Sequence, residues 1–217
     1  GGTNGKGSTC AYLECILRTA GYRAGLYTSP HLLRYNERVH LEGREATDEA
    51  LAAAFARVEA ARGSTALTYF EFGTLAAFAA FEQARVEVAV LEVGLGGRLD
   101  AVNVVDADCA IVSSVDLDHQ AWLGDSRAAI ALEKAHIYRP GRPALFGDAD
   151  RVVQRQHART GANADVLRDR SDRGTRHRGL GIEATKRVEM AFGRPDGFKA
   201  CPLYTSDAAD ELLCVDL

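Results

Sequence analysis

Hydrophobic residues follow two different spacings over the first 150 residues. Helical spacing of apolar residues predicts helices over 8–20, 48–61, 72–84 and 126–137. Short apolar runs predict strands over 24–28, 86–93, 109–115 and 143–146. The runs at 86–93 and 109–115 are mostly apolar and β-branched, as expected of strands covered on both faces. Strands alternating with helices predict an α/β fold with a mostly parallel sheet flanked by helices.

The pattern changes after residue 150. Residues 151–200 carry twelve Arg and Lys against six Asp and Glu, in a chain whose net charge is −4. Two interpretations remain open: a basic exposed linker or RNA-binding arm, or a frameshifted stretch that is not native protein sequence. Residues 201–217, which begin CPLYTSDAADE, resemble the translation of a sequencing adapter and are set aside from functional reasoning.

Composition narrows the function classes. The chain has 217 residues, of which 47% are hydrophobic and 26% charged, values typical of a globular protein. No apolar run is long enough to cross a bilayer, and the mild negative charge gives no reason to expect nucleic acid as a partner. The five cysteines form no CxxC pair, so neither a disulfide framework nor a zinc site is indicated. We therefore expect a cytoplasmic protein.

A glycine-rich loop opens the sequence. The stretch GTNGKGS, Gly2–Ser8, runs directly into the first predicted helix. Such a loop presents backbone N–H groups and the positive end of a helix to phosphate. Lys6 can reach the β- and γ-phosphates of a nucleotide, and Ser8 can bind Mg²⁺. The spacing differs from the standard phosphate loop because Gly7 separates the lysine from the serine. A chance glycine turn is the alternative.

Polar side chains follow the first three predicted strands, where each strand ends. They are Ser29 and His31, then Glu92, then Asp118 and His119. Ligands of open α/β folds gather at this edge of the sheet. A buried carboxylate at Glu92 would require a cation, and a Mg²⁺ ion beside the nucleotide would supply one. A solvated loop glutamate is the alternative.

Taken together and in order, the motifs resemble one family. They are GTNGKGST, GYRAGLYTSPHLLRYNERV, LTYFEFGTLAAF, LEVGLGGRLDAVNVVDAD, LDH followed by WLG, and EKA followed by Ile. This stretch, from Gly2 to about Gly147, is similar to the bacterial dihydrofolate synthase/folylpolyglutamate synthase family of the Mur ligase superfamily. The resemblance implies that residues 1–150 form part of a Mur-ligase central domain with a P-loop NTPase-like sheet.

The resemblance also implies an activity. Members of the family use ATP to phosphorylate the carboxylate of dihydropteroate or a folate, and the amine of L-glutamate then attacks the acyl phosphate. The implied cofactors are ATP and Mg²⁺. The implied partners are these small molecules, with no nucleic acid and no membrane, and the protein is expected to be a monomer.

Roles for individual residues follow from matching motifs. Three of them, Lys6, His119 and Lys134, are implied to be catalytic. The residues implied to bind ATP are Thr3, Asn4, Gly5, Lys6, Gly7 and Ser8. The residues implied to hold the metal ions are Ser29, Glu92, His119 and Lys134, the last as a carbamylated lysine. The residues implied to line the pterin site are Thr68, Tyr69, Phe70, Glu71, Leu99, Asp100 and Ala101. Without the resemblance, Glu133 and Lys134 read as a surface charge pair.

The sequence departs from the family pattern at a few positions. Gln120 and Ala121 stand where the family has Thr and Asp, which puts the loop around the metal in doubt. His136 replaces a glycine, which puts local packing in doubt. The strand before the phosphate loop and the C-terminal domain of the family are not matched. We therefore expect an exposed sheet edge and little or no ligase activity from this chain alone.

Two other functions stay open on the sequence. The chain could derive from a Mur-type ligase that uses a different acid, and loss of pteroate dependence would favour that reading. It could instead be a nucleic-acid-binding module that acts through residues 151–200, which requires salt-sensitive binding to phosphate backbones.

Overall fold

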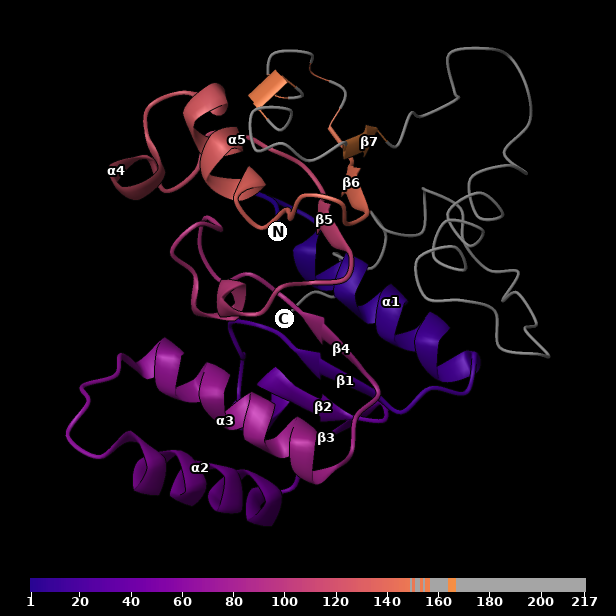
Figure 1. The fold of residues 1–217 in the computed structure, drawn as a ribbon, viewed down its shortest axis with the longest axis vertical. Helices are drawn as coiled ribbons and strands as arrows, with labels where there is room; N and C mark the ends of the chain where they lie inside the picture. The colour runs from indigo at the N-terminus through magenta and orange to yellow at the C-terminus, as the bar shows by residue number, and fades with distance from the viewer. Residues whose placement is uncertain (149, 151–152, 154, 157–163, 167–217) are drawn as a thin grey trace.

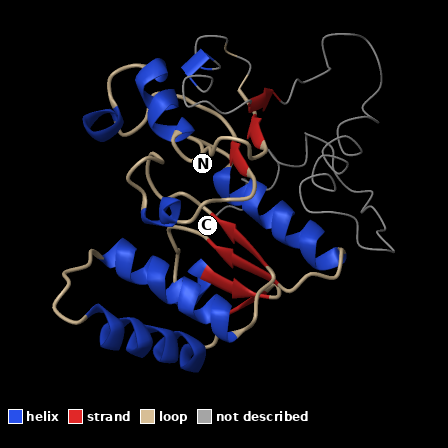
Figure 2. Cartoon of the chain, in the orientation of Figure 1, coloured by secondary structure: helices blue, strands red, loops and turns tan. Residues whose placement is uncertain are grey.

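The computed structural model describes residues 1–148, 150, 153, 155–156 and 164–166. The helices are α1 (Lys6–Thr19), α2 (Asp48–Arg62), α3 (Tyr69–Gln83), α4 (Gln120–Leu123) and α5 (Arg127–Ala135), with 3₁₀ turns at Tyr35–Arg38 and Ala101–Val104. The strands are β1 (Ala24–Tyr27), β2 (Val39–Leu41), β3 (Arg44–Glu45), β4 (Val88–Leu91), β5 (Ala110–Val112), β6 (Ala144–Phe146) and β7 (Ala164–Val166). Figures 1 and 2 show this arrangement.

Side-chain caps explain where three of the helices begin. The hydroxyls of Thr47, Thr68 and Ser126 each accept a hydrogen bond from a backbone N–H in the first turn of α2, α3 and α5. At α3 the Glu71 carboxylate also accepts from the backbone N–H of Thr68, which completes a capping box. α1 differs because it begins after Gly5 without a side-chain cap.

The strands form two sheets, and the α/β fold predicted from the sequence is confirmed. In the first sheet the order is β3-β2-β1-β4, with β1 parallel to β4 and antiparallel to β2. In the second the order is β5-β6-β7, all parallel. The antiparallel strands β2 and β3 were not predicted, because strands of three and two residues carry too little alternation to stand out.

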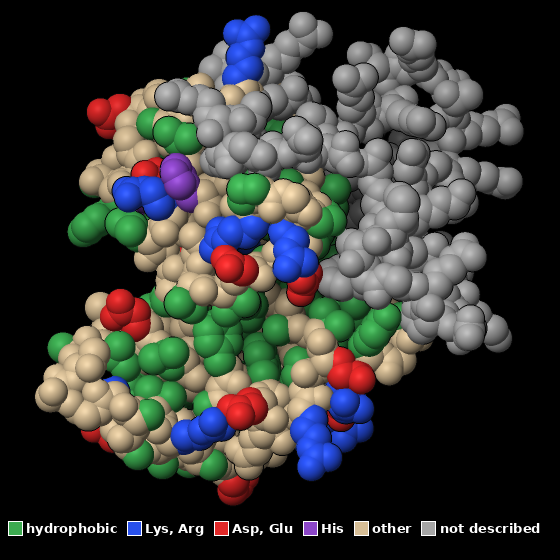
Figure 3. Space-filling model, viewed as in Figure 1, with side chains coloured by type: hydrophobic (Ala, Val, Ile, Leu, Met, Phe, Trp, Pro, Cys, Tyr) green, Lys and Arg blue, Asp and Glu red, His purple; other side chains and the backbone are tan. Residues whose placement is uncertain are grey.

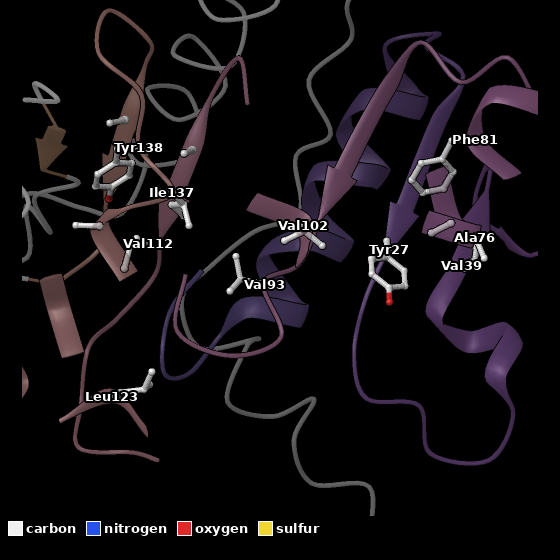
Figure 4. Close-up of a cluster of buried hydrophobic side chains, with 14 of the residues drawn as sticks. Tyr27, Val39, Ala76, Phe81, Val93, Val102, Val112, Leu123, Ile137 and Tyr138 are labelled. Atoms are coloured by element: carbon white, nitrogen blue, oxygen red, sulfur yellow. The ribbon is translucent and has the colours of Figure 1, made fainter. Parts of the chain in front are cut away.

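The helices cover the first sheet on both faces. α1 packs against β1 and β4 on one face, while α3 packs against β1 and separates it from α2 (Figure 1). The core joins the two sheets through a single cluster of buried side chains. Val93 and Val102 lie between the group around Tyr27 and the group around Val112 (Figure 4).

A cavity of about 390 Å³ lies between β4 and β5 beneath α1. Its lining is mostly apolar and includes Leu13, Val90 and Ile111. The prediction that residues 86–93 are covered on both faces is wrong for β4, where Val88 is half-buried and Ala89 is exposed. The reason is the cavity, which borders β4 on the side away from β1.

The beginning of the chain pairs with β5 beside this cavity. The Gly1 amine donates to the Ile111 carbonyl at 2.7 Å, and the Ser113 N–H donates to the Gly1 carbonyl at 3.0 Å. This is the hydrogen-bond pattern of parallel strands. The glycine-rich loop therefore begins beside the C-terminal end of β5. This is the edge of the sheet at which the sequence analysis predicted the polar side chains of the site.

The predictions made for residues 151–200 and 201–217 fall almost entirely outside the described residues. The exceptions are a few positions, including Val153, which is buried, and β7. Among the described residues, no helix combines the length and apolar character needed to cross a bilayer.

Candidate nucleotide and metal site

The glycine-rich loop is fastened to the end of β5 by its backbone. Thr3 N–H donates to the Ser114 carbonyl at 2.7 Å, and the Ser113 hydroxyl donates to the Asn4 carbonyl at 2.5 Å. A Cβ at Gly2 would fall 2.0 Å from the Ser113 hydroxyl oxygen, and its φ of +145° is itself unfavourable for other residues. This close approach is why the loop requires glycine at Gly2.

Lys6 folds back over the loop, and no hydrogen bond to the first amides of α1 is found within the described part of the chain. The Lys6 amine donates to the carbonyls of Gly2 at 3.1 Å and Thr3 at 3.3 Å. Gly5, the residue before α1, has a left-handed φ of +76°. As a glycine it has no side chain that could cap the first amides of the helix. Open amides, the positive helix end and a lysine make this loop suited to phosphate.

Glu92 lies at the end of β4 with its carboxylate buried. The residue is 5% exposed, and its Oε2 accepts a hydrogen bond from the Ser29 backbone N–H at 3.2 Å. Its other carboxylate oxygen faces the start of α1, 3.9 Å from where a Gly7 Cβ would stand. Burial raises the pKa of Glu92, opposed by that hydrogen bond and by the charge of Lys6. The burial expected from the sequence is confirmed.

No ion pair compensates Glu92 within the described part of the chain. A buried carboxylate is costly without a cation, so the position fits a divalent ion. The Glu92 carboxylate and the nearby Ser29 hydroxyl are oxygen donors of the kind that Mg²⁺ prefers. These two residues are the part of the implied metal set that the structure brings together.

Lys134 contradicts the surface pair that its spacing suggested. The residue is 4% exposed, and its amine donates to the Gly2 carbonyl at 3.0 Å. Burial and then the charge of Lys6 lower the pKa of the Lys134 amine to about 8, with Asp118 opposing this shift. Glu133 turns the other way and pairs with Arg98. Lys134 is buried because the end of α5 packs against the glycine-rich loop at Gly2.

His119 is exposed, and its ring lies beside the carboxylate of the preceding residue. It has a left-handed φ of +48°, starts α4, and its Nε2 lies 3.6 Å from an Asp118 carboxylate oxygen. The described residues contain no group of three His, Cys, Asp or Glu arranged to hold a metal ion. The implied set also includes a serine and a lysine, so a metal role for His119 stays a prediction.

The implied pterin residues divide into a packed pair and exposed neighbours. Phe70 lies over Gly94, where a Cβ would be 2.8 Å from its ring, and its centroid is 6.0 Å from that of Tyr27. The Asp100 carboxylate accepts from the backbone N–H groups of Leu95 at 2.9 Å and Val102 at 3.0 Å. Burial raises the pKa of Asp100, while these hydrogen bonds oppose it.

The other residues implied to line the pterin site lie at or near the surface. Tyr69 and Leu99 are largely exposed, at 65% and 82%, and Ala101 begins a 3₁₀ turn. Thr68 and Glu71 bond to each other in the capping box, and the Thr68 backbone N–H lowers the pKa of Glu71. On the face in Figure 3, hydrophobic side chains gather in a hollow across the middle, between charged side chains.

Known proteins resemble this chain over about two thirds of its length or more. No protein-family model matches it. It is 56% identical over 149 residues to the dihydrofolate synthase/folylpolyglutamate synthase of Escherichia coli K12, covering 69% of this chain and 35% of that protein. The corresponding Haemophilus influenzae protein is 54% identical over 148 residues, covering 68% and 34%.

Solved structures agree. E. coli FolC in complex with DHPP and ADP superposes with a TM-score of 0.73 at 51% identity, covering 76% of this chain and 40% of that one. The Yersinia pestis enzyme complexed with AMPPNP and Mn gives 0.72 at 51% identity, covering 76% and 41%. The chain belongs to the dihydrofolate synthase/folylpolyglutamate synthase family. It spans about a third of the length of these curated relatives.

The structure accommodates the departures from the dihydrofolate synthase/folylpolyglutamate synthase pattern. His136 follows α5 with an ordinary helical φ of −69°, so the backbone there does not need the glycine of the family. Its Nδ1 lies 2.7 Å from the Leu132 carbonyl. Gln120 and Ala121 are exposed in α4 and displace nothing from the core.

One buried cation at the site was not predicted. Arg38 is almost fully buried, its Nε donates to His31 Nδ1 at 2.7 Å, and its guanidinium lies 5.6 Å from the ring centroids of Tyr35 and Tyr69. The donor fixes His31 as an acceptor at Nδ1, which orients the turn after Ser29. Nothing in the spacing of Arg38 distinguishes it from a solvated arginine, because the residue ends a mostly polar 3₁₀ turn.

Proposed function

We propose that this chain supplies the nucleotide, metal and acid-binding part of an enzyme that ligates L-glutamate to dihydropteroate or a tetrahydrofolate with ATP. The observation that carries the proposal is Glu92, a buried carboxylate without a cation, beside an open phosphate loop. Relatives are described with ADP and DHPP, and with Mn, AMPPNP and L-glutamate. The whole reaction is proposed for a longer protein, because the chain spans a third of its relatives.

In this proposal the phosphate loop holds ATP. The amides at the start of α1 and the Lys6 amine bind the β- and γ-phosphates, and Lys6 exchanges its two loop carbonyls for phosphate oxygens. Ser29 and Glu92, together with His119, would hold Mg²⁺. That ion would neutralise phosphate charge and polarise the γ-phosphoryl group.

The acid is proposed to lie against Phe70 and Asp100. The Phe70 ring suits a flat heterocycle, and the Asp100 carboxylate suits its N–H donors. The acid's carboxylate oxygen then attacks the γ-phosphorus and ADP leaves. The glutamate amine attacks the acyl phosphate carbon, inorganic phosphate leaves with the C–O bond electrons, and the amine gives up a proton. The chain's task is positioning and charge compensation.

Lys134 is expected to form a carbamate. A neutral amine adds to CO₂ through a new N–C bond and releases one proton, so the reaction needs the free amine that a pKa of about 8 provides. The chain has only four lysines, Lys6, Lys134, Lys186 and Lys199, which simplifies assignment. With ¹³C-bicarbonate, a carbamate NMR signal should grow between about pH 7 and pH 9 and vanish in Lys134→Arg. A signal that persists in that variant would contradict the assignment.

The proposal is tested on the 217-residue chain by calorimetry and an ADP-release assay. AMPPNP should bind when Mn²⁺ or Mg²⁺ is present and bind much more weakly in EDTA. Dihydropteroate should bind as well, while glutamate-dependent ADP release should be absent. Metal-independent nucleotide binding would contradict the metal site. Glutamate- and pteroate-dependent ADP release would show that the chain is a complete ligase.

A further inference from the structure

The loop after β4 contacts the C-terminal end of α5 through a backbone hydrogen bond and a side-chain pair. The Arg98 backbone N–H donates to the Glu133 carbonyl at 3.1 Å. The Arg98 Nε donates to both oxygens of the Glu133 carboxylate, at 3.0 and 3.1 Å. Arg98 precedes Leu99 and Asp100 of the proposed acid site, and Glu133 precedes Lys134. Each member of the pair is thus next in sequence to a proposed functional residue.

The backbone contact beside this pair leaves no room for a side chain. A Cβ at Gly97 would lie 2.8 Å from the Glu133 carbonyl oxygen and 3.0 Å from that of Lys134. The loop therefore rests directly on the helix turn that carries Lys134. Any shift of the loop at Gly97 must move that turn or open a gap.

Two more side chains close the same junction from the far side. The Asn103 amide donates to the carbonyls of Arg98 and His136, both at 3.3 Å. Arg139 donates to the Asn103 carbonyl at 2.8 Å and to the His136 carbonyl at 3.0 Å. Both side chains thus bond the carbonyl of His136, the residue that caps the C-terminal end of α5.

We propose that Arg98 and Glu133 are positioning residues that set the acid-binding loop and Lys134 in one fixed arrangement. The inference rests on the proposed function and concerns how its two halves are held in register. The side chains of Arg98 and Glu133 are 47% and 26% exposed, so their charge attraction contributes little to overall stability. Their geometry matters because a reacting carboxylate displaced by about 1 Å costs about 100-fold in rate.

The test uses Arg98→Gln, Glu133→Gln and the swapped double variant Arg98→Glu/Glu133→Arg in the 217-residue chain. Hydrogen exchange should speed up together in residues 95–104 and 132–138 in both single variants. Affinity for dihydropteroate should fall about 10-fold in both single variants. The swapped variant should recover part of each change. Arg57→Gln, which breaks the exposed Arg57–Glu82 pair between α2 and α3, is the matched control and should change none of them.

The outcomes separate this inference from the proposed function. Unchanged exchange in residues 95–104 and 132–138 of Arg98→Gln would overturn the positioning role, whatever the chain binds. A shift in exchange at only one of the two segments would overturn it as well. If the unaltered chain forms no carbamate and binds no dihydropteroate, the proposed function fails, and coupled exchange in the single variants still decides the positioning role.

Discussion

Replacing Lys6 by alanine is expected to weaken AMPPNP binding to the chain by about 100-fold. The amine contributes charge-assisted hydrogen bonds to phosphate, each about 1.5–3 kcal/mol. Among the described residues, its hydrogen bonds go to the loop carbonyls of Gly2 and Thr3 and to no carboxylate, although its charge also opposes the rise in the pKa of Glu92. Calorimetric titration of AMPPNP in the presence of Mn²⁺ measures the loss.

The matched control for this prediction is Arg44→Ala. Arg44 lies exposed in β3 and its replacement removes the same charge, so nucleotide affinity should stay within about 2-fold if long-range attraction is screened. Equal weakening by both variants would mean that Lys6 acts only through net charge. An unchanged affinity in Lys6→Ala would remove the phosphate loop from the account.

Replacing Glu92 by glutamine is expected to have opposite effects with and without a divalent cation. With Mn²⁺ present, nucleotide affinity should fall by about 30-fold or more, because a carboxylate ligand is lost. Without the cation, the variant should be at least as stable as the unaltered chain, because an amide is cheaper to bury than a charged carboxylate. Urea unfolding with and without Mn²⁺ measures both effects.

The pH dependence of stability gives the same residue a second test. Burial raises the pKa of Glu92 in the folded chain above its ordinary value of 4.5. At a pH between the ordinary pKa and the raised one, the folded chain therefore binds a proton at Glu92 that the unfolded chain has lost. The contribution of Glu92 to the free energy of unfolding should therefore fall as pH rises through that window, and Glu92→Gln should lack this slope. A variant less stable than the unaltered chain in EDTA at every pH would show that Glu92 is structural.

Long periodic segments were predictable from the sequence, while short ones were not. α2 and α5 were found within two residues of their predicted ends, because apolar spacing and the caps at Thr47 and Ser126 point the same way. β2 and β3 were missed because five residues hold too little pattern. β4 was found, yet its burial was overestimated, since the cavity beside it depends on how the two sheets meet.

The site was predictable where a residue's chemistry conflicts with its local environment. Glu92 stood out because a carboxylate ends an apolar run. Lys134 did not, since the next residue Glu133 offered an apparent partner and only packing decides which of the two is buried. Arg38 and Arg98 were also missed. Arginines are common on surfaces, and the partners of these two, His31 and Glu133, lie in other parts of the chain, so only packing reveals the contacts.

ADP release by a chimaera shows directly whether residues 1–148 serve a folate-dependent ligase. Residues 1–148 of this chain replace the matching segment of the E. coli dihydrofolate synthase/folylpolyglutamate synthase, with which the chain shares 56% identity. We expect ADP release that requires both L-glutamate and dihydropteroate and that is abolished by Lys6→Ala and by Glu92→Gln. Release that is indifferent to dihydropteroate would contradict this expectation and indicate a Mur-type ligase for another acid.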